Sequence, residues 1–128
     1  MKVVRRGGRA FSMIEMTLVI ALIGILMTVA VFAFLPKLLE GKVTATKATM
    51  HTVNGALLSY KAANNTFPTT LTQLVNNYLP TLPKDGWKKE FYYNPQGANG
   101  RPFDLISGGE DLTLGTQDDI DWAKVEQE

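Results

Sequence analysis

The sequence predicts an α+β protein in which one long N-terminal helix packs on a small head with a short antiparallel sheet. Three observations support this prediction: an apolar run at residues 16–35, a helical apolar stripe over residues 37–63, and two short strand patterns further on. We expect three parts along the chain, namely a basic segment (1–10), a membrane-spanning helix (11–36) and a head (37–128).

Length and composition exclude several classes of protein. The chain has 128 residues, which suits one small domain. Its formal net charge is +1, from 13 basic and 12 acidic residues, and this balance disfavours a nucleic-acid-binding protein. It has no cysteine, so disulfides, thiolate metal sites and a cysteine nucleophile are excluded. The single histidine, His51, cannot form a multi-histidine metal site in one chain, and we expect it at the helix surface.

The apolar run at residues 16–35 carries no charged side chain. A helix of about 20 residues spans about 30 Å, which is the thickness of the hydrocarbon core of a bilayer. A cleaved secretory signal or a buried core helix is the alternative. Bulky residues follow the run where a secretory signal has small ones, and the rest of the chain is too short to cover a helix that is apolar on all sides. The excess of basic residues before the run favours a cytoplasmic N-terminus and an exported head.

The helix is expected to continue through the first part of the head. Pro36 should kink rather than end it, because the apolar stripe resumes at once, and the pair Asn64-Asn65 should end it. The stripe comprises Leu39, Val43, Thr46, Met50, Val53, Leu57 and Tyr60.

The rest of the head is expected to contain a short helix and two strands. The helix should start after Phe67-Pro68, with Thr69 or Thr70 as its cap. Its inner face would comprise Leu71, Leu74, Val75 and Tyr78. The strands are predicted at Glu90–Tyr93 and Phe103–Ile106, with a short third strand or an ordered loop after them. The aromatic residues Trp87, Tyr92 and Tyr93 are expected to pack on the sheet and core.

A motif stands at the start of the apolar run. Four basic residues, then Ala10, Phe11 and, four positions later, Glu15 precede the run. The Glu15 carboxylate either reaches the lipid headgroups or pairs with a cation from another chain. The pattern resembles the class III signal of type IV pilins and pseudopilins. The resemblance implies that a membrane peptidase cuts between Ala10 and Phe11 and methylates the new amine, which Glu15 of a neighbouring subunit then neutralises. The family usually has Gly where this chain has Ala10.

An acidic segment lies near the C-terminus, with the sequence SGGEDLTLGTQDDIDW over residues 107–122. Carboxylates and hydroxyls of this kind suit a calcium ion, which takes six to eight oxygen ligands in flexible geometry. A solvated acidic loop stabilised by Asx-turns is the alternative. The spacing of the carboxylates excludes an EF-hand.

From Phe103 to Trp122 the chain resembles the C-terminal signature of the major pseudopilin of type II secretion systems. The shared pattern is F-D-L-x-S-x-G-x-D, followed by six residues and D-D-I. Family members bind a structural calcium ion here, and the usual Pro-Asp-Gly is Glu110-Asp111-Leu112 in this chain. The resemblance implies side-chain ligands at Asp111, Thr116, Asp118 and Asp119, with backbone carbonyl ligands at Gly108 and Thr113.

The same resemblance implies a type IV pilin-like fold and a structural role without catalysis. Such a subunit polymerises with itself into a periplasmic pseudopilus that drives protein export across the outer membrane. Before assembly it would span the inner membrane once. The implied partners are a prepilin peptidase, an assembly ATPase, a platform membrane protein and minor pseudopilins, with no nucleic acid.

Two other functions are weighed against this one. A type IV pilin for adhesion, motility or DNA uptake is the first alternative, although many such pilins close their C-terminal region with a disulfide. A membrane-anchored periplasmic enzyme is the remote alternative. Adjacent carboxylates such as Asp118 and Asp119 are poorly placed for opposed acid and base roles. The cluster Lys84, Lys88 and Lys89 is expected to be a solvated loop or a contact for the acidic tail of a neighbouring subunit.

Overall fold

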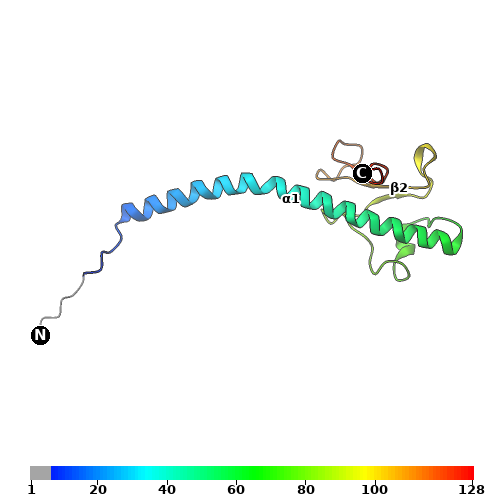
Figure 1. The fold of residues 1–128 in the computed structure, drawn as a ribbon, viewed down its shortest axis with the longest axis horizontal. Helices are drawn as coiled ribbons and strands as arrows, with labels where there is room; N and C mark the ends of the chain where they lie inside the picture. Colours follow the sequence, from blue (N-terminus) through cyan, green and yellow to red (C-terminus); the bar gives the residue numbers. More distant parts are fainter. Residues whose placement is uncertain (1–6) are drawn as a thin grey trace, which may run out of the picture. The chain divides into compact units, whose positions relative to one another are not determined.

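The computed structural model describes residues 7–128, and the chain divides into two compact units after Lys37. The predicted leader residues Lys2, Arg5 and Arg6 lie outside the described residues. We call residues 38–128 the head. The elements in chain order are α1 (Met13–Asn64), the 3₁₀ turn η1 (Leu71–Leu74), β1 (Tyr92–Asn94), the 3₁₀ turn η2 (Ala98–Gly100), β2 (Asp104–Ser107), β3 (Ile120–Asp121) and α2 (Trp122–Val125) (Figure 1).

The first part of α1 confirms the helix predicted over the apolar run. Within residues 7–128, α1 is the one helix long and apolar enough to cross a membrane. Its most apolar stretch of 18 residues has a mean hydropathy of 3.0, and none of that stretch is buried. The hydroxyls of Thr17 and Thr28 donate to the carbonyls of Met13 and Gly24, at 2.9 Å each. Because these hydroxyls are hydrogen-bonded within the helix, placing them in an apolar environment costs little free energy.

The second part of α1 carries the predicted apolar stripe. Pro36 lies inside the helix, which ends at Asn64 as predicted, with Asn65 in the left-handed conformation (φ 60°). Of the stripe residues, Thr46, Met50, Val53 and Leu57 are fully buried. The Thr46 hydroxyl, which would be costly to bury alone, donates to the carbonyl of Lys42 at 2.8 Å.

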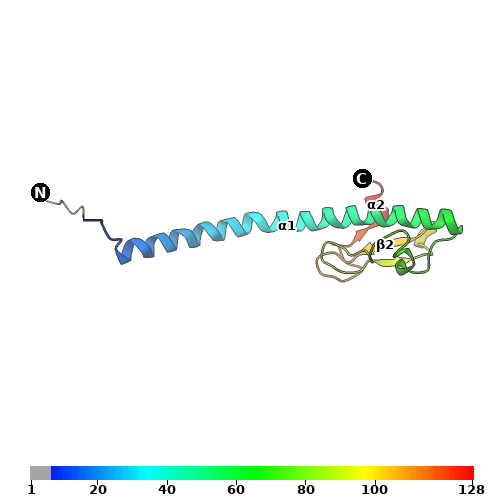
Figure 2. The ribbon, with the colours of Figure 1, turned by 90° about the horizontal axis from the view of Figure 1, so that it is seen from below.

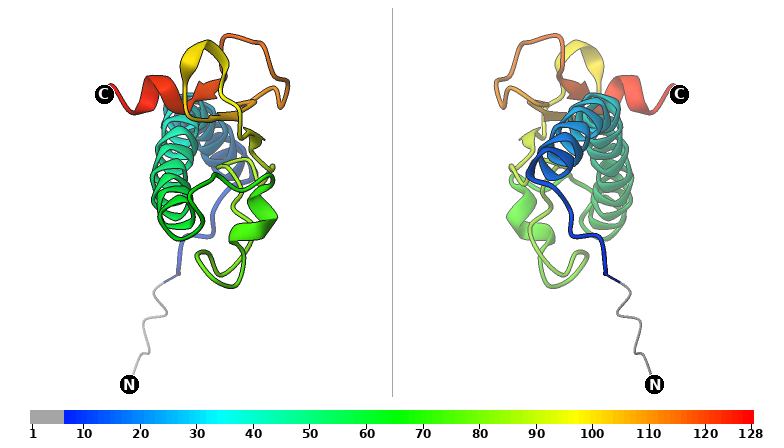
Figure 3. Two further views of the ribbon diagram at one scale, coloured as in Figure 1. Left: turned by 90° about the vertical axis from the view of Figure 1, so that its right-hand side faces the viewer. Right: turned by 90° about the vertical axis from the view of Figure 1, so that its left-hand side faces the viewer.

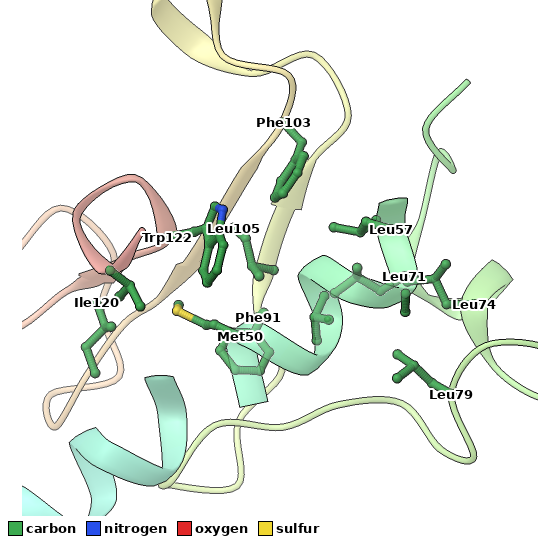
Figure 4. Close-up of a cluster of buried hydrophobic side chains, with 13 residues drawn as sticks. Met50, Leu57, Leu71, Leu74, Leu79, Phe91, Phe103, Leu105, Ile120 and Trp122 are labelled. Atoms are coloured by element: carbon green, nitrogen blue, oxygen red, sulfur yellow. The ribbon is translucent and has the colours of Figure 1, made fainter. Parts of the chain in front are cut away.

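The hydrophobic core lies between this stripe and the rest of the head. Figure 4 shows Met50 and Leu57 of α1 pointing toward Leu105 of β2, toward Phe103 just before that strand, and toward Trp122. The buried core residues run from Met50 to Val125, and the partly buried residues packed on them begin at Val43. The head therefore contains this core in full.

A three-stranded antiparallel sheet, in the order β1-β2-β3, covers the helix. Tyr93 pairs with Leu105, and Ser107 pairs with Ile120. Figures 2 and 3 show the sheet and η1 on the same side of the second part of α1. The predicted strands exist, but each begins one or two residues later than expected. The predicted α+β architecture is confirmed.

The predicted second helix is wrong in length and in its cap. η1 is one 3₁₀ turn, and the Thr70 side chain makes no capping hydrogen bond. Val75 is extended and Asn76 has a φ of 76°, because the Val-Asn-Asn sequence has low helix propensity and Pro80 follows closely. Leu71 and Leu74 are nevertheless buried as predicted.

The short helix α2 was not predicted. The Asp121 carboxylate caps it by accepting the amide hydrogen of Ala123 at 3.0 Å. Trp122 is buried, and the His51 ring meets its ring edge to face, with centroids 4.9 Å apart. The exposed His51 therefore serves helix packing in this structure, in keeping with its expected place at the surface.

Candidate functional site

The start of α1 is closed by a reciprocal pair of hydrogen bonds. The backbone amide of Ser12 donates to Glu15 Oε2 at 2.9 Å, and the amide of Glu15 donates to Ser12 Oγ at 3.2 Å. This is a capping box, which satisfies two amides that the helix leaves unpaired at its N-terminus. The sequence signal for this capping box is S-x-x-E before an apolar run, which was not among the predicted features.

The predicted cleavage position lies just before this capping box. Ala10 and Phe11 are exposed and belong to no helix or strand, and α1 begins two residues after Phe11. Because both residues are exposed and lie outside any helix or strand, the Ala10–Phe11 bond is accessible to a peptidase, which acts on exposed backbone. Glu15 is exposed in the first turn of the helix.

In the acidic loop, residues 108–119, oxygen atoms converge on the hydroxyl of Thr116. Thr116 Oγ1 lies 2.7 Å from Asp118 Oδ1, and 3.3 Å from both Asp111 Oδ1 and Asp119 Oδ1. It also lies 3.0 Å from the backbone carbonyl oxygen of Thr113. A hydroxyl has one proton and can satisfy only one of these acceptors fully. The loop therefore gathers more oxygen acceptors than its own donors can pair.

The second oxygen of two of these carboxylates holds the loop backbone. Asp118 Oδ2 accepts the amide hydrogen of Asp111 at 3.0 Å, and Asp119 Oδ2 accepts that of Gly115 at 2.7 Å. Asp111 Oδ1 accepts the amide hydrogen of Thr113 at 2.8 Å. The hydrogen bonds from the Asp111 amide and the Thr116 hydroxyl lower the pKa of Asp118. Asp118 is thus set to remain a carboxylate.

Three residues of the loop have a positive φ: Gly109, Leu112 and Gly115 (φ 92°). Gly109 has a φ of 61°, and a Cβ there would overlap the carbonyl oxygen of Asp118. Leu112 has a φ of 59°, although a branched side chain is strained in this region. Leu112 stands where the resembling family has the glycine of Pro-Asp-Gly. The chain thus keeps the backbone conformation that the glycine would favour and accepts the strain.

The six predicted ligand residues are not placed equally. Asp111, Thr116, Asp118, Asp119 and the Thr113 carbonyl lie together, as described above. A Cβ added at Gly108 would lie 3.0 to 3.3 Å from the backbone of Leu112 and Thr113, so the loop passes close to this glycine. In the described residues, no three His, Asp or Glu side chains alone form a metal-binding cluster. The donor set depends on the hydroxyl and the backbone carbonyl.

A hydrogen-bonded chain that sequence analysis missed connects this loop to the turn at residues 85–89. The buried Asp85 carboxylate accepts the amide hydrogens of Trp87 and Lys89, at 3.0 and 2.8 Å, and the hydroxyl of Ser107 at 2.6 Å. Ser107 Oγ in turn accepts the amide hydrogen of Gly109 at 3.3 Å. The Asp-Gly pair at 85–86 signalled a turn, but nothing local signalled the partner Ser107.

Comparison with known proteins identifies the family to which the chain belongs. The family model described as type II secretion system (T2SS), protein G matches residues 33–124. The type II secretion system core protein G of Pseudomonas aeruginosa is 32% identical, and the match covers 89% of this chain and 92% of that protein. The protein of the same name from Escherichia coli is 32% identical, and the match covers 88% of each chain. By the span and identity of these matches, the chain belongs to the type II secretion system protein G family.

Proposed function

We propose that this protein is the structural subunit of the pseudopilus of a type II secretion system, in which it polymerises with itself to drive protein export across the outer membrane. One observation carries the proposal beyond family membership. Every residue from Met13 to Leu38 is exposed in the isolated chain, although most are apolar. Such a surface requires a bilayer or other copies of the same helix around it. The matches to secretion-system proteins favour this function over a type IV pilin.

We also propose the location, processing and partners that follow. The N-terminus is cytoplasmic and the head periplasmic, in keeping with the basic residues before the apolar run. A prepilin peptidase cuts before Phe11 and methylates it. An assembly ATPase, a platform membrane protein and minor pseudopilins act in polymerisation, and the subunit itself has no catalytic role.

The acidic loop is proposed to bind one calcium ion. The donor set fits a hard cation, because it consists of carboxylate, hydroxyl and carbonyl oxygens, with Asp118 favoured as the anion. The ligands in this proposal are Asp111, Thr113 O, Thr116, Asp118 and Asp119, with Gly108 O as a further candidate. When bound, calcium neutralises carboxylates that otherwise repel one another, and it stabilises the folded loop.

The processing and assembly steps can be tested on protein from membranes that contain the secretion system. Intact mass should show a chain that starts at Phe11 and carries one methyl group. Cross-linking between cysteines placed in the apolar parts of α1 should yield a ladder of multimers. A mature chain that still begins at Met1, or one that remains monomeric when the assembly ATPase is active, would contradict the proposal.

A further inference from the structure

The head contains two Asn-Gly pairs, the dipeptide in which asparagine loses its side-chain amide most readily. One pair is Asn54-Gly55 in α1, and the other is Asn99-Gly100 in η2, within the connection between β1 and β2. The reaction begins when the backbone nitrogen of the second residue attacks the side-chain carbonyl carbon of the asparagine. Glycine favours this attack because it has no Cβ to hinder it and because its backbone rotates freely. Reaction at each pair therefore depends on whether the fold lets these two atoms meet.

The second pair lies in an exposed turn. Asn99 and Gly100 are both exposed, and Figures 1 and 3 show the connection that carries them, in yellow, protruding from the sheet. Asn99 has a φ of 58° and a ψ of 33°, and Gly100 has a φ of 78°. Beyond its chain neighbours, no heavy atom lies within 4 Å of the position that a Cβ on Gly100 would occupy. This open space leaves room for the rotation about the Cα–C bond of Asn99 that ring closure requires.

The first pair is held apart by the helix that contains it. Asn54 and Gly55 lie well inside α1, and the adjacent residues Val53 and Ala56 are buried in the core. In a helical backbone the next nitrogen points away from the side-chain carbon, so attack at Asn54 would require local unwinding and displacement of these core residues. Asn54 can therefore react only in the open fraction of molecules, which is about 10⁻³ or less for a stable fold.

A third asparagine separates the effect of the backbone from that of the following glycine. Asn65 is exposed and has a φ of 60°, close to the value at Asn99. The residue after it is Thr66, whose branched side chain hinders attack by its own backbone nitrogen. Among these three asparagines, Asn99 alone combines an exposed turn with a following glycine.

We propose that Asn99 is a site of spontaneous deamidation in the folded protein. The backbone nitrogen of Gly100 forms a bond to Cγ of Asn99, and the bond from Cγ to Nδ2 breaks. The amide proton of Gly100 passes through solvent to the leaving nitrogen, which departs as ammonia. Water then opens the resulting cyclic imide. Opening at Cγ gives aspartate, and opening at the backbone carbonyl carbon gives isoaspartate, in which the main chain runs through the former side chain.

Both products place a carboxylate in a turn that ionic contacts hold to the sheet. Asp104 Oδ2 accepts the amide hydrogen of Ala98 at 3.0 Å. Arg101 Nη1 donates to Asp121 Oδ2 at 3.1 Å and lies 3.6 Å from Asp104 Oδ1, which is buried and has no hydrogen-bond partner among the described residues. A new carboxylate two residues before Arg101 competes for its guanidinium, and isoaspartate adds one atom to the backbone of the turn. Deamidation should therefore loosen the attachment of the turn to β2.

The test follows the unmodified full chain in detergent micelles at mildly alkaline pH over several weeks. Peptide mapping by mass spectrometry detects the gain of about 1 Da at each asparagine, and an isoaspartate-specific methyltransferase detects the second product. We expect Asn99 to convert first. Asn54 should convert at least about a hundred-fold more slowly, because it reacts only when the head opens. Asn65 should also lag, because Thr66 hinders the attack.

Unfolding the chain in urea provides the matched reference. There the two Asn-Gly pairs should convert at similar rates, because only the fold distinguishes them. The Asn99→Gln variant, which would need a less favourable six-membered ring, should lose the isoaspartate signal of the folded chain. Conversion of Asn99 in the folded chain that is no faster than that of Asn54 or Asn65 would overturn the proposal.

The effect on the turn is measured separately with the Asn99→Asp variant, which has the composition of one product. Hydrogen exchange at the amides of Ala98 and Arg101 should be faster than in the unmodified chain. Asn77→Asp adds the same charge at another exposed position and should leave this exchange unchanged. Unaltered exchange in Asn99→Asp would show that the new charge does not loosen the turn. None of these measurements involves polymerisation, so their outcome is independent of the proposed function.

Discussion

Ser12 and Glu15 each accept the backbone amide hydrogen of the other, so the residue expected to pair with a neighbouring subunit also caps its own helix. The two roles differ in what they require. Capping needs a side-chain acceptor and is served equally by Glu or Gln at this position, whereas pairing with a positive amine needs a charge.

This difference yields a prediction for assembly. Glu15→Gln keeps a capping acceptor and removes the charge, and we expect it to abolish filament formation in the cross-linking assay. Ser12→Ala removes a cap and keeps the charge, and it should assemble, with a loss of helix stability of about 1 kcal/mol. Helix content is checked by circular dichroism in detergent. Normal assembly of Glu15→Gln would show that Glu15 acts only as a cap.

A second prediction concerns calcium. The head, residues 38–128, contains its core in full and can be studied alone. Its melting temperature should rise with calcium over that in chelator. Saturation at 100 times Kd stabilises the folded state by about 2.7 kcal/mol. Magnesium should substitute poorly, because it demands a smaller octahedral shell.

Variants of the acidic loop test which groups bind the ion. Asp118→Asn should lose most of the calcium-dependent rise, and Thr116→Val should lose much of it, because its hydroxyl lies at the centre of the oxygen group. Glu126→Gln removes a carboxylate outside the loop and should respond to calcium as the unmodified head does. Equal melting temperatures in calcium and chelator for the unmodified head would leave a solvated acidic loop as the explanation.

Leu112 provides a third prediction, on strain. Because its φ is 59°, Leu112→Gly should raise the free energy of unfolding of the head by up to about 1 kcal/mol. Leu114→Gly is the matched control, since Leu114 is equally exposed but is not among the described residues with positive φ. That change should lower stability instead, because glycine gains freedom in the unfolded chain. A lowered stability for both variants in urea unfolding would contradict the strain argument.

The fourth prediction is a pH dependence at Tyr93. Its hydroxyl donates to the carbonyl of Pro68 at 2.9 Å, and burial, with a smaller contribution from Tyr60, raises its pKa from 10.0 to about 12. A raised pKa favours the folded state fully below pH 10, and this contribution is lost as the pH rises toward 12.

Tyr93→Phe should therefore change two measurements. At neutral pH it should cost about 1 kcal/mol, through the lost hydrogen bond. Between pH 10 and 12 its stability should decline less than that of the unmodified head. Tyr92→Phe, which changes an exposed neighbour, should leave the alkaline decline in place. An unchanged decline in Tyr93→Phe would assign the effect to another group.

Sequence analysis predicted the features that depend on local pattern. The membrane-length helix, the stripe through Met50 and Leu57 and the end at Asn64 follow from periodicity and from turn residues. The short helix after Thr70 was overestimated, since its apolar spacing looked helical while Asn76 favoured a turn. The helix α2 is one turn long and depends on the packing of Trp122, so no periodicity could reveal it.

The candidate site was predictable to a similar degree. The residue types of the acidic loop pointed to oxygen ligands, and the structure brings most of them together around Thr116. The bond between Asp85 and Ser107 could not be foreseen, because it joins residues 22 positions apart through the fold alone. The carbonyl of Gly108 stays a predicted ligand.

The hydrogen bond between Ser107 and Asp85 affects how the head unfolds locally. Ser107 joins Asp85 to Gly109, and Gly86 beside Asp85 is bonded to Thr46 on the helix. The turn at residues 85–89 and the acidic loop therefore share one hydrogen-bonded chain and should unfold locally as one cooperative unit rather than as two independent loops. Any ligand that closes either loop would thereby slow the opening of both.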